Sequence, residues 1–212
     1  MGAMAFRGFP EEALEFYEGL EADNSKAYWT DHKDTYDGSV AAPMKELLTE
    51  LSAFGEAKMF RPYRDVRFSK DKTPYKTRQY AVVHVGNQGL YVGIDAHGLH
   101  LGGGMFHTTP DQVKSLREAI DGSRGEALTK VLDGLRKKGY EVGGDQLKRV
   151  PKPWDDEHPR ADLLRHKTLI SWVDHAPAEW LHTAKAKAEV SKAWKALTPL
   201  NDWLAAATGS PS

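Results

Sequence analysis

QYAVVHVGNQGLYVGIDAHGLHLGGGMF, residues 79–106, decides the fold class of this chain. The stretch is rich in β-branched and aromatic residues, and it is interrupted at residues 86–89 (GNQG) and at His97-Gly98. Such residues favour strands, and short interruptions that contain Gly and Asn favour tight turns between strands. The stretch therefore predicts several short strands joined as a mostly antiparallel meander.

Helical sequences flank the meander on both sides. Apolar residues recur at helical spacing in the segments 9–22, 28–36 and 44–54 before it, and in 110–120, 126–138 and 177–207 after it, where short strands are expected near 140–142 and 168–174. Helices, then strands, then helices is the order of an α+β fold. We predict a mostly antiparallel central sheet packed by N-terminal and C-terminal helices. Residues 6–207 are expected to form a single domain, with a disordered or tag-derived start at 1–5 and a frayed tail at 208–212.

Composition excludes several classes of protein. The 212 residues carry a net charge of -1 and include no cysteine, so disulfides, thiolate nucleophiles and iron–sulfur clusters are excluded. No signal-peptide pattern and no apolar segment of about 18 residues is present, which predicts a cytoplasmic protein without a membrane partner. P-loop, Rossmann, Gly-x-Ser-x-Gly and His-Glu-x-x-His motifs are also absent, so we predict no cofactor.

Histidines and glycines in the meander allow two readings each. His84, His97, His100 and His107, with Asp95, could suit zinc or iron, but no pair has the spacing of a metal motif. We therefore prefer half-buried or surface histidines and predict no metal. The run 102–104 (GGG) could form an anion-binding nest, or it could mark a place where another backbone approaches closely; we prefer the second reading.

Positive charge is concentrated in RPYRDVRFSKDKTPYKTR, residues 61–78, which holds seven basic and two acidic side chains. Residues 64–69 read as a strand with Asp65 and Arg67 on one face, followed by a polar turn. Like charges at this density repel one another unless an anion lies among them, and Arg and Lys suit phosphate or carboxylate. The run therefore predicts a site for a small phosphorylated or carboxylated ligand.

Several residues are candidates for this site. The predicted ligand-binding residues are Arg61, Arg64, Arg67, Lys72 and Lys76, with Lys148, Arg149 and Lys152 contributed by a later loop. Asp65, Tyr75 and His107 are weak candidates for proton transfer. An Asp beside several arginines should be ionised, which suits orienting an arginine better than donating a proton. We therefore favour binding over catalysis, and the reaction, if there is one, is left open, as is the oligomeric state.

Two other functions remain open. Basic residues interleaved with Tyr63, Phe68, Tyr75 and Tyr80 could contact phosphates and stack on bases in a nucleic-acid-binding module, although the balanced net charge and the shortness of the patch argue against it. Alternatively, the arginines could make internal ion pairs in a structural or partner-binding protein.

The motif R-x-x-R-D-x-R-F-S-K-D-K-x-P-Y-K, residues 61–76, resembles the signature of a conserved hypothetical family of bacteria and some fungi. The similarity extends over nearly the whole chain and includes Asn24, Trp29, Lys33, Tyr36, the glycines 102–104, the segment 147–152 (LKRVPK) and the segment 158–160 (HPR). Pro153 stands where the family tends to have glycine. The resemblance implies a domain of unknown function and a set of shared positions, without an assigned activity.

Overall fold

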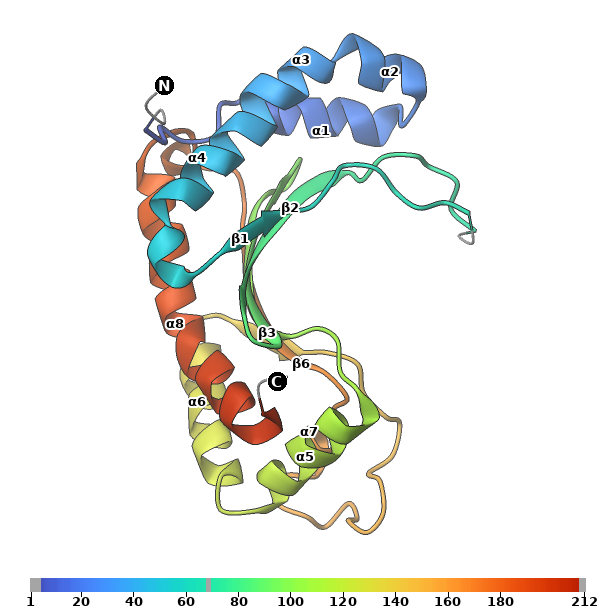
Figure 1. Cartoon of the computed structure of the whole chain (residues 1–212), viewed down its shortest axis with the longest axis vertical. Coiled ribbons are helices and arrows are strands. Elements are labelled where there is room, and N and C mark those ends of the chain that lie inside the picture. Colours follow the sequence, from blue (N-terminus) through green and yellow to red (C-terminus); the bar gives the residue numbers. More distant parts are fainter. Residues whose placement is uncertain (1–4, 68–69, 210–212) are drawn as a thin grey trace. The chain divides into compact units, whose positions relative to one another are not determined.

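The structure is a computed structural model that describes residues 5–67 and 70–209 (Figure 1). The first helices are α1 (Glu12–Ala22), α2 (Lys26–Asp31), α3 (Lys33–Thr35), the π-helical turn η1 (Tyr36–Ala41), α4 (Ala42–Glu50) and the 3-10 turn η2 (Ser52–Phe54). The strands are β1 (Ala57–Met59), β2 (Arg78–Val85), β3 (Gln88–Asp95), β4 (Gly98–Met105), β5 (Glu141–Gly143) and β6 (Leu169–His175). The later helices are α5 (Pro110–Asp121), α6 (Gly125–Lys137), α7 (Ala161–Leu164), the 3-10 turn η3 (Glu179–His182) and α8 (Lys185–Thr208).

The described strands form a six-stranded antiparallel sheet in the order β1-β2-β3-β4-β6-β5. Because β2, β3 and β4 are consecutive both in sequence and in the sheet, residues 79–106 form the predicted meander. β1 pairs antiparallel with β2, with Lys58 opposite Val82, and β5 pairs antiparallel with β6, with Val142 opposite Ser171. The predicted α+β fold is confirmed. Among the described residues, no helix is both long enough and apolar enough to cross a membrane.

The chain divides into two compact units, which are described separately below. The first unit comprises Met1–Val83, Tyr91–Leu101 and Asp174–Lys192, and the second comprises His84–Leu90, Gly102–Val173 and Ala193–Ser212. The expectation of a single domain over 6–207 stays a prediction. Most of the expected start at 1–5 and tail at 208–212 lies outside the described residues.

The core of the first unit is built on the apolar stripe of α1. Leu14, Phe16, Tyr17 and Leu20 are all buried, and they follow the helical spacing of the sequence. Ser25 caps α2, because its hydroxyl accepts a hydrogen bond from the backbone N–H of Tyr28 (3.1 Å).

The core of the second unit is built on α5 and α6. Leu116 and Ile120 of α5 and Leu128, Leu132 and Leu135 of α6 are buried at spacings of three and four residues. Thr109 and Gln112 form a capping box at the start of α5, which agrees with the helix start expected at Pro110.

Two helical expectations differ from the structure. The segments 28–36 and 44–54 are predicted as separate helices, but the chain continues between them through η1 into α4, with Pro43 at the first turn of α4. A π-helical turn accommodates an extra residue without ending the helix, and proline fits the first turn because no hydrogen bond is required of its nitrogen there.

The single C-terminal helix expected over 177–207 is instead η3 followed by α8. The N-terminal segment is hydrogen-bonded to the backbone of η3, since the N–H of Phe9 donates to the carbonyl of Leu181 (2.9 Å). A Cβ on Gly8 would lie 2.3 Å from the carbonyl carbon of His182, so this close approach requires glycine. Hydrogen bonding to a neighbouring segment therefore replaces helix at this point.

Candidate functional site

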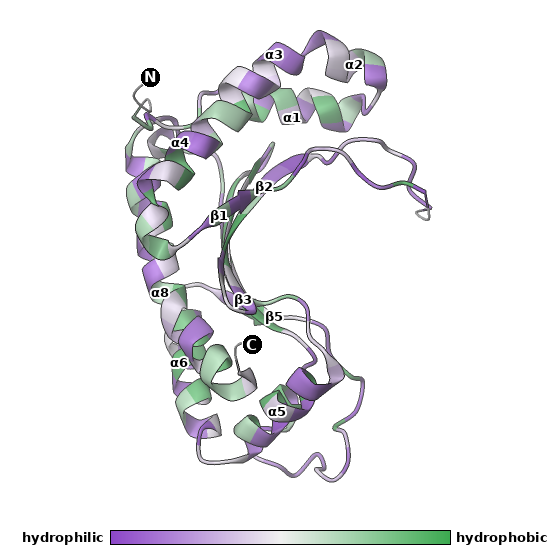
Figure 2. Ribbon diagram, in the orientation of Figure 1, coloured by the Kyte–Doolittle hydropathy of each residue, from purple (hydrophilic) through white to green (hydrophobic). Residues whose placement is uncertain are grey.

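Residues 61–67 and 70–77 form the two sides of a hairpin-like arm that leaves the sheet between β1 and β2 (Figure 1) and is coloured mostly as hydrophilic in Figure 2. Its two sides meet at the antiparallel bridge between Tyr63 and Tyr75. The N–H of Arg64 donates to the carbonyl of Pro74 (2.9 Å), and the N–H of Lys76 donates to the carbonyl of Pro62 (2.8 Å). Because proline has no N–H to return, the pairing does not extend into a ladder.

The predicted strand over 64–69 is therefore wrong for residues 64–67, which have no strand pairing. Phe68 and Ser69 lie outside the described residues. The expected shared face of Asp65 and Arg67 does occur, because Arg67 Nε and Nη2 donate to the two carboxylate oxygens of Asp65 at 2.9 and 2.6 Å.

Asn24 joins the arm to the loop between α1 and α2. Its side-chain amide donates to the carbonyl of Tyr75 (3.1 Å) and accepts from the N–H of Tyr75 (3.0 Å), as a neighbouring peptide group would. The Tyr75 ring stacks on Trp29 with centroids 4.4 Å apart and planes 7° apart. Asn24 and Trp29 thus hold the returning side of the arm.

Replacing Asn24 with alanine is expected to lower the free energy of unfolding by about 1–3 kcal/mol, because two part-buried backbone groups of Tyr75 lose their partner. Urea unfolding measures the change. Asn87→Ala is the control, since Asn87 makes one weak contact to the Met105 sulfur (3.2 Å), and it should cost less than about 1 kcal/mol. Equal costs for the two variants would contradict the anchoring role of Asn24.

Gln79 connects the start of β2 to the helices. Its amide nitrogen donates to the carbonyls of Phe60 (2.7 Å) and Tyr80 (2.8 Å), and its oxygen accepts from the hydroxyl of Tyr36 (2.6 Å). Burial raises the pKa of Tyr36 to about 12, so this hydroxyl remains a donor at neutral pH. The backbone that carries the basic residues on either side of Gln79 is therefore held firmly.

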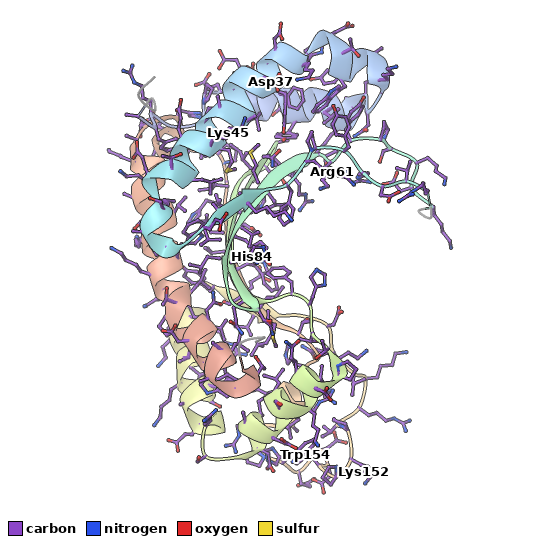
Figure 3. The ribbon with its side chains drawn as sticks, viewed as in Figure 1. Asp37, Lys45, Arg61, His84, Lys152 and Trp154 are labelled. Atoms are coloured by element: carbon purple, nitrogen blue, oxygen red, sulfur yellow. The ribbon has the colours of Figure 1, made fainter. Side chains whose placement is uncertain are left out.

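A cavity of about 270 Å³, called here the basic pocket, lies at the base of the arm. Its lining residues are Phe60, Arg61, Arg64, Lys76, Thr77, Arg78, Gln79 and Tyr80. Four of these described residues are basic and none is acidic. Figure 3 places Arg61 at the point where the arm meets β2.

Aromatic rings and backbone carbonyls orient two of the cations. Lys76 Nζ donates to the carbonyl of Arg61 (2.9 Å) and lies 5.6 Å from the centroid of the Phe60 ring. Arg78 lies 5.7 Å from the centroid of the Tyr80 ring and donates to its hydroxyl (3.2 Å). Among the described residues, neither Lys76 nor Arg78 forms an ion pair with a carboxylate, and the rings stabilise both cations.

Arg61 and Arg64 complete the charge of the pocket. Among the described residues, no acceptor for the guanidinium of Arg61 is found, whereas Arg64 pairs with Asp71 and donates to the Thr73 hydroxyl (2.9 Å). Burial, followed by the charges of Arg61 and Arg64, lowers the pKa of Lys76. The pocket therefore has an excess of positive charge, which disfavours the protonated form of Lys76.

The remaining predicted ligand residues lie outside this lining. Arg67 pairs with Asp65, and Lys72 Nζ donates to the carbonyl of Val66 (2.9 Å), both in the outer part of the arm. Lys148, Arg149 and Lys152 are exposed on the loop between β5 and α7 of the second unit, where Figure 3 labels Lys152. Their part in a ligand site stays a prediction.

The three weak candidates for proton transfer have other surroundings. Hydrogen bonds from Arg67 lower the pKa of Asp65, which keeps this carboxyl ionised. Tyr75 is buried beneath the arm, and burial raises the pKa of its hydroxyl. His107 is exposed in the segment after β4. None of the three lines the basic pocket.

Sequence reasoning missed a second cluster in the first unit. His100 lies between two carboxylates: Nδ1 is hydrogen-bonded to Asp174 Oδ1 at 2.7 Å, and Nε2 lies 2.8 Å from Asp95 Oδ1. The Nε2 contact is an ion pair whose N–H is not aligned for a hydrogen bond. Within the described parts of the chain, no three His, Cys, Asp or Glu side chains are placed to hold one metal ion.

The comparison with protein families identifies one family for this chain. The family model for the conserved hypothetical protein DUF2461 matches residues 12–203. The chain therefore belongs to this family, as the sequence resemblance implied, and the matched range covers the arm, the pocket and both units. No curated protein matches the chain.

Proposed function

We propose that the protein binds a small anionic ligand, a phosphorylated or carboxylated molecule, in the basic pocket. The observation that carries this proposal is the convergence of Arg61, Arg64, Lys76 and Arg78 on one cavity without a lining carboxylate. Burial lowers the pKa of Lys76, and the charges of Arg61 and Arg64 lower it further; a bound anion would relieve this repulsion. Arginine forks and the Thr77 hydroxyl are suitable donors to phosphate or carboxylate oxygens.

The dimensions of the pocket favour a small ligand. About 270 Å³ is slightly below the range of roughly 300–1,000 Å³ of pockets for drug-sized molecules. Phe60 and Tyr80 are already covered by Lys76 and Arg78, so these rings support the cations and do not offer an open stacking platform. Binding of a compact anion is therefore favoured over stacking of exposed bases.

The internal ion pairs of the arm support two different roles for the basic residues at 61–78, one structural and one in ligand binding. Arg67 pairs with Asp65 and Arg64 with Asp71, which fits the alternative that part of the run is structural. Arg61, Lys76 and Arg78 have no such carboxylate partner among the described residues. We assign the structural role to the outer arm and ligand binding to its base.

Calorimetric titration with inorganic phosphate at low ionic strength tests the proposal. Arg61→Ala is expected to weaken phosphate binding about tenfold or more, because it removes a charged donor that makes no hydrogen bond to a described residue. Arg67→Ala is the matched control, since Arg67 is an arginine of the same arm outside the pocket lining, and it should change the affinity less than about twofold.

Three outcomes would contradict the proposal. Wild-type protein that binds no phosphate would exclude this class of ligand. Equal losses in Arg61→Ala, Arg67→Ala and Lys72→Ala, together with a steep dependence on salt, would indicate general attraction of polyanions to the arm. Unchanged affinity in Arg61→Ala would place the site elsewhere.

A further inference from the structure

Asp95, His100 and Asp174, which all belong to the first unit, come from β3, β4 and β6. The exposed fraction of the side chain is 4% for Asp95, 17% for His100 and 54% for Asp174. The cluster thus runs from a buried carboxylate through an imidazole to a carboxylate in contact with solvent. Asp95 Oδ1 also accepts from the backbone N–H of His97 (2.8 Å), which fixes the buried end.

The same sheet face connects this cluster to the basic pocket. Arg78 and Tyr80 are two residues apart on β2, so both project from one face of the sheet. The Tyr80 ring lies across Gly93, where a Cβ would be 2.1 Å from Tyr80 Cε1, and its centroid is 6.5 Å from that of His100. Tyr80 therefore lies between the guanidinium of Arg78 and the imidazole of His100.

Charges at the two places act on each other. Arg78 is among the groups that lower the pKa of Asp95, after burial, which opposes this change, and after the stronger contacts from His100 and His97. Asp95 correspondingly favours the charged form of Arg78, behind the hydrogen bond to Tyr80. The electrostatic effect of Asp95 on Arg78 is weaker when His100 carries a positive charge, because the imidazolium compensates the carboxylate.

His100 is poorly placed to serve as a base for a bound ligand. Both ring nitrogens already lie within 2.8 Å of carboxylate oxygens, so neither has a free lone pair directed at the pocket. An imidazole between two carboxylates is stabilised as the imidazolium, in which both nitrogens can donate. A change of charge is therefore the property that this cluster can transmit.

We propose that His100 makes anion binding in the basic pocket dependent on pH. Protonated His100 compensates the negative charge of Asp95, whereas neutral His100 leaves that charge to offset the positive charge of Arg78. The inference rests on the proposed function and adds a mode of regulation to that site. Among the described residues, the charged and titratable groups in contact with His100 are Asp95 from β3, Asp174 from β6 and Tyr80 from β2, while Arg78 from β2 acts on Asp95. The His97 ring extends away toward Glu21 of α1, with Nε2 3.7 Å from Glu21 Oε2.

The direction of the effect follows from the charges. Burial disfavours the imidazolium, but Asp95 and Asp174 outweigh it and raise the pKa of His100 above its ordinary 6.5. His100 is therefore charged near pH 6 and loses its charge above that range, so affinity for an anion should fall as the pH rises. By linkage, a bound anion should raise the pKa of His100 further.

Sulfate is a suitable probe, because it remains doubly charged over the whole pH range of the test, within which inorganic phosphate changes its charge. Calorimetric titration of wild-type protein should give a dissociation constant about fivefold larger at pH 8.5 than at pH 6. His100→Gln should lose most of this dependence. His97→Gln is the matched control, a histidine of the neighbouring turn, and it should keep the dependence.

Two further measurements do not depend on the folding of His100→Gln. NMR titration of the wild-type imidazole should show a higher pKa for His100 with saturating sulfate than without it. Asp174→Asn, a change at an exposed side chain, should move the pH midpoint of sulfate affinity downward, because one of the two carboxylates that favour the imidazolium is neutralised.

The outcomes separate the two proposals. Sulfate binding that does not vary with pH, or that varies equally in His100→Gln, overturns the role of His100 and leaves the pocket as an anion site. A His100 pKa that does not move on saturation with sulfate overturns it as well. Absence of sulfate binding at every pH overturns the proposed function itself.

Discussion

Alanine at position 104 is expected to lower the free energy of unfolding by more than about 3 kcal/mol. Gly104 has φ of +130°, which side chains rarely adopt, and a Cβ there would lie 2.3 Å from the carbonyl oxygen of Leu169 and 2.7 Å from Cα of Ile170. Both atoms belong to the backbone of β6, so neither can move aside cheaply. Strain and overpacking therefore add in one substitution.

Gly102→Ala provides the control for Gly104→Ala. Its added Cβ would lie 3.4 Å from the carbonyl oxygen of Ser171, an ordinary contact, and the cost should stay below about 1 kcal/mol. Urea unfolding followed by circular dichroism measures both variants. Similar stabilities for the two would contradict the close approach of β6 and reopen the reading of the glycine run as an anion nest.

The second large effect is expected for Trp29→Ala. Trp29 is 4% exposed and its ring contacts those of Phe16, Tyr36, Tyr63 and Tyr75 at centroid distances of 5.8, 4.9, 5.7 and 4.4 Å. Removing it should cost about 3–5 kcal/mol, because it leaves a large cavity in the first unit. Phosphate affinity should fall as well, since the stack on Tyr75 holds the arm.

Circular dichroism is the measurement for Trp29→Ala, because the substitution alters tryptophan fluorescence directly. Tyr63→Ala tests the opposite edge of the same aromatic cluster, where the residue is 46% exposed, and it should cost about 1 kcal/mol or less. If Trp29→Ala weakens folding and leaves phosphate affinity intact in the folded fraction, the arm does not depend on this stack.

Much of the fold could be predicted because its signals are local. The turn at 86–89 and the β-branched residues around it define β2 and β3, and Pro110 begins α5 as expected. The failures are tertiary. No sequence pattern near Leu181 indicates that its carbonyl would accept a hydrogen bond from Phe9 and that the C-terminal helix would be interrupted there. Nothing local indicates that Pro62 would lie opposite Lys76 and Pro74 opposite Arg64, which limits the pairing of the arm.

The candidate site, like the fold, could be predicted only in part from the sequence. Density of charge identified Arg61, Arg64 and Lys76, which line the pocket, but it could not distinguish them from Arg67 and Lys72, which do not. Strand alternation from Lys76 would have added Arg78 and Tyr80, which share its parity along the chain. Discrimination within the run required knowledge of which side chains find internal partners.

The cluster around His100 had no sequence signal. Asp174 lies 74 positions from His100 along the chain, and the two meet only because β6 is the neighbour of β4 in the sheet. A metal reading had grouped His100 with Asp95, yet the structure places the imidazole between carboxylates where it can carry charge. Long-range strand order, which sequence patterns do not encode, creates this arrangement.

The attachment of the arm through Asn24 means that the basic run is not a portable motif. A synthetic peptide of residues 61–78 would carry all seven cations but would lack the amide of Asn24, which stands in for a missing strand beside Tyr75. It would also lack the Trp29 ring beneath the arm. Transplanting the pocket into another scaffold would require the α1–α2 hairpin to be carried with it, although that hairpin contributes no side chain to the pocket lining.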